Sequence, residues 1–301
     1  MEQLYGAVDI GGTKIMIAVV DQNGNIRGQK TIKTLELDVS LTMLKIISTL
    51  KEQCALLNKS LHSLLGIGIV CAGPVNLSSQ TVENPYTLPG WEHYPIVKVL
   101  AGYSGLPVKL ENDVNGALLG EIFLRKITKQ RVFMLAFGTG IGGAFFEQGH
   151  LYRAGNGFHP ELGHMVVDIH EKPCYCGKHG CFESLWSGSA LHKRAKLLGF
   201  QDFNDLYKAW KLHDPIATHF IKKISTELQT AIWNIGIVFK LDLLILGGGL
   251  MNTYFPFAKE IIEESLDDKD DFVPPFKILQ ADAERNPALI GAMLLISETL
   301  K

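Results

Sequence analysis

The feature that most constrains the fold is a pattern that occurs twice in the 301-residue chain, with the copies starting about half a chain apart. Residues 5–28 predict a strand, a glycine-rich turn, a second strand, an Asn-Gly turn and the start of a third strand. Residues 131–152 repeat this order, with a Gln-Gly-His turn at the second bend. Short turns of this composition favour β-hairpins. We therefore expect two lobes, each headed by one hairpin unit, with a ligand in the cleft between them.

The rest of the chain alternates between predicted strands and predicted helices. Apolar residues at helical spacing predict a helix over 40–58, and the apolar run 65–70 indicates a buried strand. The other predicted strands are 107–110 and 241–246, and the other predicted helices are 114–124, 216–238 and 287–300. This alternation is typical of the α/β class.

Length and charge exclude several classes of protein. A chain of this length is expected to form about two domains, at roughly 150 residues each. The 29 basic and 31 acidic residues give a formal net charge of −2, which leaves no strongly basic face for nucleic acid. No apolar run reaches the ~18 residues that span a bilayer. The first residues lack the basic stretch of a signal peptide, so we expect a cytoplasmic protein that binds neither nucleic acid nor a membrane.

The first hairpin turn carries residues suited to phosphate binding. It contains Gly11 and Gly12, with Asp9 before them and Thr13 and Lys14 after them. Glycine lets backbone N–H groups approach a phosphate because no Cβ intervenes. The hydroxyl and the ammonium group add a donor and a positive charge.

The second hairpin turn, Gly138–Gly143, has the same capacity through Gly138, Thr139 and Gly140. Neither turn fits the P-loop pattern. The second turn satisfies G-x-G-x-x-G, but the residues after it are too few for the helix that a dinucleotide-binding site requires, which excludes a Rossmann domain. Tight turns without a ligand are the alternative, and the repetition favours phosphate binding.

Three of the five cysteines lie within eight positions of one another, which predicts a metal site. Cys174, Cys176 and Cys181 have the spacing C-x-C-x4-C. Three thiolates and one imidazole suit a tetrahedral, structural Zn²⁺ site, whereas a cytoplasmic setting disfavours disulfides. The spacing leaves both His164 and His179 open as the fourth ligand. The other two cysteines lie in apolar segments and are expected in the core.

Taken together, these segments resemble the ROK family of repressors and sugar kinases over essentially the whole chain. The family's motifs are carried by Asp9–Lys14, Glu111–Asn115, Gly138–Gly143, His159–His164, Cys174–Glu183 and Leu246–Gly249. The resemblance implies a two-lobed sugar kinase/actin-like ATPase fold of the ribonuclease H-like type, and a homodimer that uses ATP and Mg²⁺ to phosphorylate a hexose hydroxyl. We expect one lobe over 1–116 plus 288–301 and the other, with the second glycine turn and the zinc site, over 117–287.

The resemblance also implies catalytic roles. It makes Asp113 the general base that accepts the proton of the sugar hydroxyl during phosphoryl transfer. Asn112 is expected to bind neighbouring sugar hydroxyls. At the boundary between a predicted strand and a predicted helix, Asp113 is also typical of a helix N-cap. Asp9 is expected near the ATP phosphates, where it holds Mg²⁺ through water.

Further contacts to ATP are expected from both halves of the chain. Thr13 and Thr139 are expected to contact phosphates together with the glycines beside them. Gly247, Gly248 and Gly249 follow a predicted strand and would let the backbone pass close to the nucleoside. Catalysis would then depend mainly on positioning and on charge neutralisation.

The family pattern selects His164 as the fourth zinc ligand. The zinc would pin the surrounding loops around the sugar without taking part in the chemistry. Contacts to sugar hydroxyls are implied for Glu161, Glu183 and His164. Asn84, which precedes Pro85, is a further candidate contact, and a turn residue is its alternative interpretation.

The identity of the sugar stays open among several members of the family. The segment 84–91 resembles glucokinases, and the segment 159–164 also resembles fructokinases. N-acetylmannosamine and N-acetylglucosamine kinases share almost every motif. We expect 6-hydroxyl phosphorylation of glucose or a related aldohexose, with those sugars as alternatives. A repressor would need a DNA-binding segment ahead of Asp9, where there is no room for one, and a sugar sensor without catalysis is the other alternative class.

Overall fold

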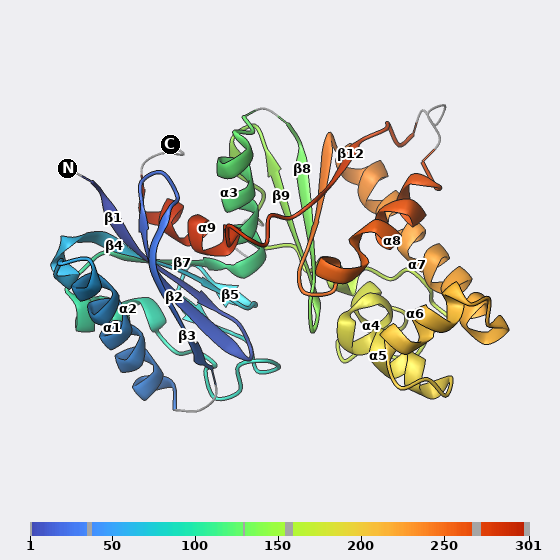
Figure 1. Ribbon diagram of the computed structural model, residues 1–301, viewed down its shortest axis with the longest axis horizontal. Helices are drawn as coiled ribbons and strands as arrows, with labels where there is room; N and C mark the ends of the chain where they lie inside the picture. The colour runs from blue at the N-terminus through green and yellow to red at the C-terminus, as the bar shows by residue number, and fades with distance from the viewer. Residues whose placement is uncertain (1, 35–37, 129, 154–158, 267–271, 298–301) are drawn as a thin grey trace. The chain divides into compact units, whose positions relative to one another are not determined.

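The computed structural model describes residues 2–34, 38–128, 130–153, 159–266 and 272–297, and it divides into two compact units (Figure 1). The first unit comprises Met1–Lys129, Gly149–Pro160 and Asp282–Lys301, and the second comprises Gln130–Gln148 and Glu161–Ala281. Within the described ranges, every helix is too short or too polar to serve as a membrane span.

The first unit contains a five-stranded sheet made of β1 (Leu4–Ile10), β2 (Lys14–Asp21), β3 (Ile26–Lys33), β4 (Leu64–Cys71) and β7 (Val108–Asn112). Its strand order is β3-β2-β1-β4-β7. The first three strands pair antiparallel, whereas β4 and β7 run parallel to β1. A separate short pair follows, made of β5 (Val75–Asn76) and β6 (Thr81–Val82).

The second sheet repeats this plan with β8 (Val132–Phe137), β9 (Ile141–Glu147), β10 (His150–Leu151), β11 (Leu243–Gly247) and β12 (Lys277–Gln280). Its strand order is β10-β9-β8-β11-β12. The strands β8 and β9 form an antiparallel hairpin, and β11 runs parallel to β8 and β12. Each sheet is therefore headed by a hairpin unit and extended by parallel strands, which confirms the predicted duplication and the α/β class.

Helices cover both faces of the first sheet. They are α1 (Val39–Leu56), α2 (Ile96–Ser104), α3 (Asp113–Arg125) and α9 (Pro287–Ile296). The side chains of β1 alternate, so that Val8 packs in a core with α1 and α2, while Ala7 packs in a second core with α9. Asp9 shares the parity of Ala7 and therefore lies on the face covered by α9.

The second sheet packs one face against a bundle of five helices. These are α4 (Phe182–Trp186), α5 (Gly188–Leu197), α6 (Phe203–Lys211), α7 (Pro215–Phe239) and α8 (Met251–Glu263). The core between them is rich in aromatic rings, with the Phe137 ring edge-on to both Phe182 and Trp186. Of these helices, only α7 corresponds to a helix predicted from the sequence, over 216–238.

The helix boundaries agree with the predictions to within a few residues. The predicted helix 287–300 corresponds to α9, and its residues 298–300 lie outside the described residues. The predicted lobe limits at 116/117 and 287/288 cut α3 and place Pro287 apart from α9. In the structure both helices belong whole to the first unit, because α3 packs along α9.

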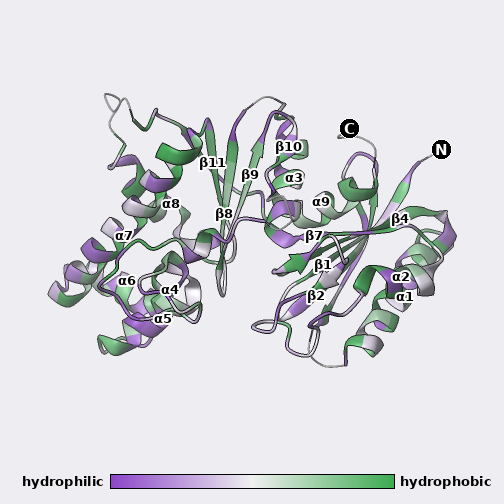
Figure 2. Cartoon of the chain, turned by 180° about the vertical axis from the view of Figure 1, so that it is seen from behind, coloured by the Kyte–Doolittle hydropathy of each residue, from purple (hydrophilic) through white to green (hydrophobic). Residues whose placement is uncertain are grey.

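Helix α9, which is largely hydrophobic (Figure 2), passes in backbone contact with both β4 and α3. A Cβ on Gly68 of β4 would lie 1.7 Å from the carbonyl oxygen of Ala292. A Cβ on Gly291 would lie 1.8 Å from the carbonyl oxygen of Gly116 in α3. Only glycine fits at these contacts, so the packing of α9 fixes the position of α3 and of Asp113 at its start.

We expect Gly291→Ala to destabilise the protein by about 1–3 kcal/mol or more, because the new methyl group must push α9 away from α3. The matched control is Gly102→Ala in α2, where a Cβ meets nothing within 4 Å. That exchange should instead stabilise the helix, by up to about 1 kcal/mol. Urea denaturation of both variants measures the difference, and equal midpoints for the two would contradict the packing argument.

Candidate active site

Three parallel strands of the first sheet end side by side, and two carboxylates lie at that edge. In the strand register Ile10 pairs with Cys71, and Cys71 pairs with Asn112. Asp9 lies one residue before the end of β1, and Asp113 directly follows β7. Burial, and then the charges of Asp113 and Asp9, raise the pKa of the Cys71 thiol. The carboxyl ends of parallel strands are a common position for ligand sites, and here they gather two acidic groups.

Asp113 is the first residue of α3, and Asn112 caps the helix. The Asn112 Oδ1 accepts hydrogen bonds from the backbone N–H of Val114 at 3.0 Å and of Asn115 at 3.2 Å. Its Nδ2 donates to Asp113 Oδ1 at 3.0 Å, and the Val114 N–H donates to the same oxygen at 2.9 Å. The interpretation of Asp113 as the N-cap is therefore wrong, because Asn112 fills that position and also orients the Asp113 carboxylate.

Both carboxyl groups titrate near neutral pH. Burial raises the pKa of Asp113 to about 6, although the Val114 hydrogen bond and the charge of His159 oppose the rise. Burial and the charge of Asp113 raise the pKa of Asp9 to about 7, against the opposing charge of Lys14. Either group can therefore accept or release a proton under physiological conditions.

His159 lies beside this pair, although the sequence reasoning gave it no chemical role. A Cβ on Gly73 would lie 2.7 Å from Asn112 Nδ2 and 2.8 Å from His159 Cε1, so both side chains border the same glycine. The charge of His159 lowers the pKa of Asp113. The signal that could have found it is its position at the head of the motif 159–164.

An ion pair joins Arg153, which is exposed, to the buried Glu111 at the end of β7. The Glu111 Oε1 accepts hydrogen bonds from the Asn112 N–H at 2.9 Å and from Asn115 Nδ2 at 3.0 Å. The other oxygen pairs with the guanidinium of Arg153. A buried carboxylate needs such partners, since an unpaired charge would be strongly destabilising there. Nothing around Arg153 in the sequence indicates this role.

The first glycine turn is closed by a hydrogen bond from the Gly11 N–H to the Lys14 carbonyl at 3.0 Å. A Cβ on Gly12 would lie 3.0 Å from the Cβ of Thr87, so the turn packs closely against the loop after β6. The side chains of Thr13 and Lys14 are exposed. The turn thus presents a hydroxyl and an ammonium group on a backbone that has little space for side chains.

Asn84 is buried, and its side chain binds within its own loop. The Oδ1 accepts from the N–H groups of Tyr86 and Thr87, each at 3.0 Å. The Nδ2 donates to Thr87 Oγ1 at 2.7 Å and to the Ala72 carbonyl at 3.2 Å. These bonds match the alternative interpretation of Asn84 as a turn residue, and a sugar contact by its side chain stays a prediction.

The second glycine turn is held by the start of α5. The Gly188 N–H donates to the Gly138 carbonyl at 2.9 Å, and Ser189 Oγ donates to the Thr139 carbonyl at 2.7 Å. Within the turn, the Gly138 N–H bonds the Gly140 carbonyl at 2.9 Å. The carbonyl groups therefore face the helix, and the Thr139 side chain is exposed.

The third glycine segment, Gly247–Gly249, packs against the end of β8. Gly248 has a φ of +87°, and a Cβ there would lie 2.4 Å from the carbonyl oxygen of Phe137. The Leu250 N–H donates to that carbonyl at 3.1 Å. Gly248 thus needs glycine both for its positive φ and for this contact, and the segment lies next to the second glycine turn.

A four-residue cluster of metal-ligating side chains lies in the second unit. The ligand atoms of His164, Cys174, Cys176 and Cys181 all lie within 4.8 Å of one another. The Cys174 Sγ is 3.6 Å from His164 Nδ1, and the sulfur atoms of Cys176 and Cys181 are 3.5 Å apart. His179 is outside this cluster, and its Nδ1 lies 3.1 Å from a backbone carbonyl. The structure therefore brings His164, and not His179, to the three thiols.

Two glutamates lie near this cluster but differ in their surroundings. Glu161 is exposed just before the short 3-10 helix Leu162–His164. Glu183, in the first turn of α4, accepts a hydrogen bond from the Ile141 N–H at 2.7 Å. Burial, and then the charge of Glu183, raise the pKa of the Tyr175 hydroxyl, and the Tyr175 ring packs edge-on against His164 with centroids 5.0 Å apart. No pattern in the sequence indicates a role for Tyr175.

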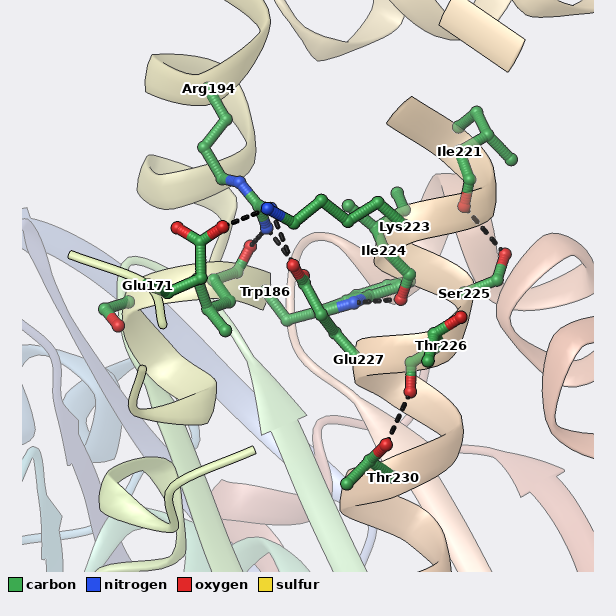
Figure 3. Close-up of polar contacts among 12 residues, drawn as sticks. Glu171, Trp186, Arg194, Ile221, Lys223, Ile224, Ser225, Thr226, Glu227 and Thr230 are labelled. Atoms are coloured by element: carbon green, nitrogen blue, oxygen red, sulfur yellow. Dashed lines mark hydrogen bonds and ion pairs between the residues drawn. The ribbon is translucent and has the colours of Figure 1, made fainter. Parts of the chain in front are cut away.

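Polar contacts link α4, which carries Glu183, and α5 to α7 (Figure 3). Arg194 of α5 donates to both carboxylate oxygens of Glu227 in α7, at 2.6 and 2.7 Å, while Lys223 pairs with Glu171. The Trp186 Nε1 donates to the Ile224 carbonyl at 2.7 Å. Asp168, Glu171 and Glu227 come close enough to hold a cation together. Because Arg194 and Lys223 already neutralise two of them, we assign this group a structural role.

The chain resembles curated sugar kinases along most of its length. It is 28% identical to N-acetylmannosamine kinase of Vibrio cholerae, over 81% of this chain and 83% of that protein. It is also 28% identical to a glucokinase of Halalkalibacterium halodurans, over 83% and 81%, and to a putative fructokinase of Bacillus subtilis, over 99% and 97%.

Solved structures of sugar kinases share the fold over nearly the whole chain. A ROK hexokinase from Thermus thermophilus has a TM-score of 0.79 at 26% identity, covering 98% of this chain and 97% of that one. A ROK family glucokinase from Streptomyces griseus, in complex with glucose and AMPPNP, has a TM-score of 0.73 at 27% identity, covering 97% and 98%. The two-lobed sugar kinase/actin-like ATPase fold is thereby established. The ROK family profile matches residues 5–299, and the chain belongs to the ROK family.

Proposed function

We propose that this chain is an ATP-dependent hexose kinase that phosphorylates the 6-hydroxyl of an aldohexose such as glucose, with Asp113 as the general base. The observation that carries the proposal is the buried Asp113 carboxyl, with a pKa of about 6, at the edge of three parallel strands. A base with this pKa is ionised at physiological pH and still accepts a proton as the hydroxyl attacks phosphorus. Since Asn112 and Val114 bond Oδ1, we assign the proton transfer to Oδ2.

ATP and Mg²⁺ are the proposed co-substrate and cation. Asp9 would hold Mg²⁺ through water. Its carboxylate oxygens are ligands that this cation prefers, and its buried position near the charge of Asp113 would be stabilised by a cation. The bound cation would neutralise charge on the phosphates. The phosphate contacts are assigned to Gly11, Gly12, Thr13, Lys14, Gly138, Thr139 and Gly140, and the nucleoside contacts to Gly247, Gly248 and Gly249. The AMPPNP in the Streptomyces griseus relative supports the choice of ATP.

The contacts to the sugar hydroxyls are assigned to Asn84, Asn112, Glu161, His164 and Glu183. His164 can serve both the metal and the sugar because its ring has two nitrogen atoms. Its Nδ1 lies toward Cys174 Sγ, which leaves Nε2, on the other side of the ring, for a hydroxyl. A metal on Nδ1 would also fix the orientation of the ring.

The four-residue cluster fits a structural Zn²⁺ ion. A tetrahedron with Zn–S bonds of about 2.3 Å and a Zn–N bond of about 2.0 Å has S–S edges of about 3.8 Å and S–N edges of about 3.5 Å. The observed separations of 3.5 Å and 3.6 Å are close to these values. Since the four ligands close the coordination shell, the ion would hold the loop and would not activate water.

The sugar itself is proposed as glucose, with N-acetylmannosamine, N-acetylglucosamine and fructose as alternatives. The relatives named for glucose, N-acetylmannosamine and fructose are all 28% identical to this chain, so identity does not choose among them. A sugar sensor without catalysis is the alternative class, and the raised pKa of Asp113 favours an enzyme. A homodimer is the proposed assembly, which light scattering of the purified protein would measure.

We expect ATP-dependent ADP release with glucose in a coupled assay across glucose, mannose, fructose, N-acetylmannosamine and N-acetylglucosamine. Product analysis should place the phosphate on the 6-hydroxyl. A preference for an N-acetylated sugar or for fructose would support the assignment as a kinase but would contradict glucose as its substrate. Sugar binding without turnover of any of the five sugars would contradict the assignment as an enzyme and favour a sugar sensor.

We expect Asp113→Asn to lower kcat by at least about 100-fold while it stabilises the ligand-free protein at pH 8. The folded state raises the pKa of Asp113 from 3.8 to about 6, so it binds more protons than the unfolded chain between these values. Stability therefore falls as pH rises through this window, and the ionised group is destabilising above it. Asparagine cannot ionise, so the advantage of the variant should shrink as the pH falls toward 4.

Urea denaturation at several pH values measures this effect, and Asp242→Asn provides a control of opposite sign. Although burial raises it, hydrogen bonds from Arg131 hold the pKa of Asp242 below its ordinary value. Its removal should therefore destabilise the protein at pH 8. A folded Asp113→Asn variant that keeps the wild-type kcat would refute the assignment of Asp113 as the base.

We expect His164→Ala and Cys176→Ser to lose bound zinc, whereas His179→Ala should keep about one ion per chain, because His179 lies outside the cluster. Elemental analysis of dialysed protein measures the zinc content. Full zinc in His164→Ala together with loss in His179→Ala would reverse the choice of the fourth ligand.

A further inference from the structure

Glu183 joins two parts of the second unit that the sequence treats as separate motifs. Its Oε2 accepts a hydrogen bond from the Ile141 N–H, at the end of the second glycine turn. The same oxygen lies 2.3 Å from the position that a Cβ on Gly140 would occupy. A side chain at 140 would therefore displace the Glu183 carboxylate from the Ile141 N–H.

One short segment, 183–189, forms hydrogen bonds with the glycine turn at three of its residues. Glu183 binds the turn at Ile141, as described, and the backbone of Gly188 binds it at Gly138. Ser189 binds the carbonyl of Thr139, which lies between them. A turn with this many fixed backbone groups keeps its N–H groups in one arrangement, which is what anion binding by a backbone cradle requires.

The same segment begins at the metal cluster. Helix α4 starts directly after Cys181, which places Glu183 two residues from a metal ligand. Tyr175 lies between Cys174 and Cys176, its ring packs against His164, and the charge of Glu183 acts on its hydroxyl. Glu183 thus lies close in the chain to the metal cluster and close in space to Tyr175, and it holds the glycine turn through the Ile141 N–H.

We propose that Glu183 is a positioning residue for the second glycine turn, through which the metal cluster and Tyr175 set the affinity for the ATP phosphates. The inference rests on the proposed function for its nucleotide, but the mechanical link concerns this chain's own backbone. This positioning role differs from a role of Glu183 in sugar binding alone. It predicts that nucleotide affinity depends on the metal cluster even when no sugar is bound.

The test compares Glu183→Ala, Glu183→Gln and Tyr175→Phe with the control Glu147→Gln, which changes an exposed carboxylate at the far end of β9. Hydrogen exchange of the ligand-free, zinc-loaded protein should speed up at the Ile141 amide in Glu183→Ala. Glu183→Gln keeps an acceptor and should restore most of the protection. Zinc removal from the wild type by a chelator should also speed up exchange at this amide.

Calorimetry with AMPPNP, without sugar, supplies the second measurement. If loss of the bond leaves about one molecule in ten with the turn in its binding arrangement, the Kd of Glu183→Ala becomes about tenfold weaker, with a smaller loss for Tyr175→Phe and no change for Glu147→Gln. Zinc content should stay near that of the wild type in all four variants.

Unchanged exchange at Ile141 in Glu183→Ala, or weakened glucose binding with unchanged AMPPNP binding, would overturn the link. Failure of the wild-type protein to bind AMPPNP would instead overturn the proposed function, since the exchange measurement does not depend on a nucleotide. Faster exchange together with weaker AMPPNP binding supports both.

Discussion

The backbone of α9 is in direct contact with the backbones of β4 and α3. These contacts are possible because Gly68, Gly116 and Gly291 have no side chain there. Contacts this close leave α3 little freedom to shift, since any movement would open a gap on one side of α9 or a clash on the other. Asp113 is the first residue of α3, so its carboxylate is placed by packing that occurs about one turn away, at Gly116. The geometry of the candidate base therefore depends on glycines that never touch a substrate.

The same packing brings two carboxyl groups together in a buried position, where ionisation of each is destabilising. Asp9 and Asp113 lie at neighbouring strand ends, and burial raises the pKa of each toward neutrality. Two other buried carboxylates each pair with a guanidinium group, Glu227 with Arg194 and Glu111 with Arg153. Perturbed carboxyl groups without such a partner are typical of sites that bind a cation or transfer a proton.

The sequence motifs located much of the site, and the structure supplied the partners. The spacing of the cysteines predicted a metal cluster, and the strand–helix boundary predicted the position of Asp113. The contributions of Arg153 and Tyr175 could not be predicted, because each depends on a neighbour that is distant in sequence or on which way a loop turns. Asn84 illustrates the reverse case, since its four hydrogen bonds within one loop leave its sugar contact as a prediction.

Local patterns alone determined the two hairpin units, the α/β class and the order of the glycine turns, because alternating apolar residues and glycine-rich bends act over a few neighbouring positions. Tertiary structure decided which groups face one another. It selected His164 over His179 for the thiol cluster, made Asn112 rather than Asp113 the helix cap, and joined Glu183 to Ile141. These outcomes depend on distances between segments that only the packed chain brings together, and no periodicity within a segment encodes them.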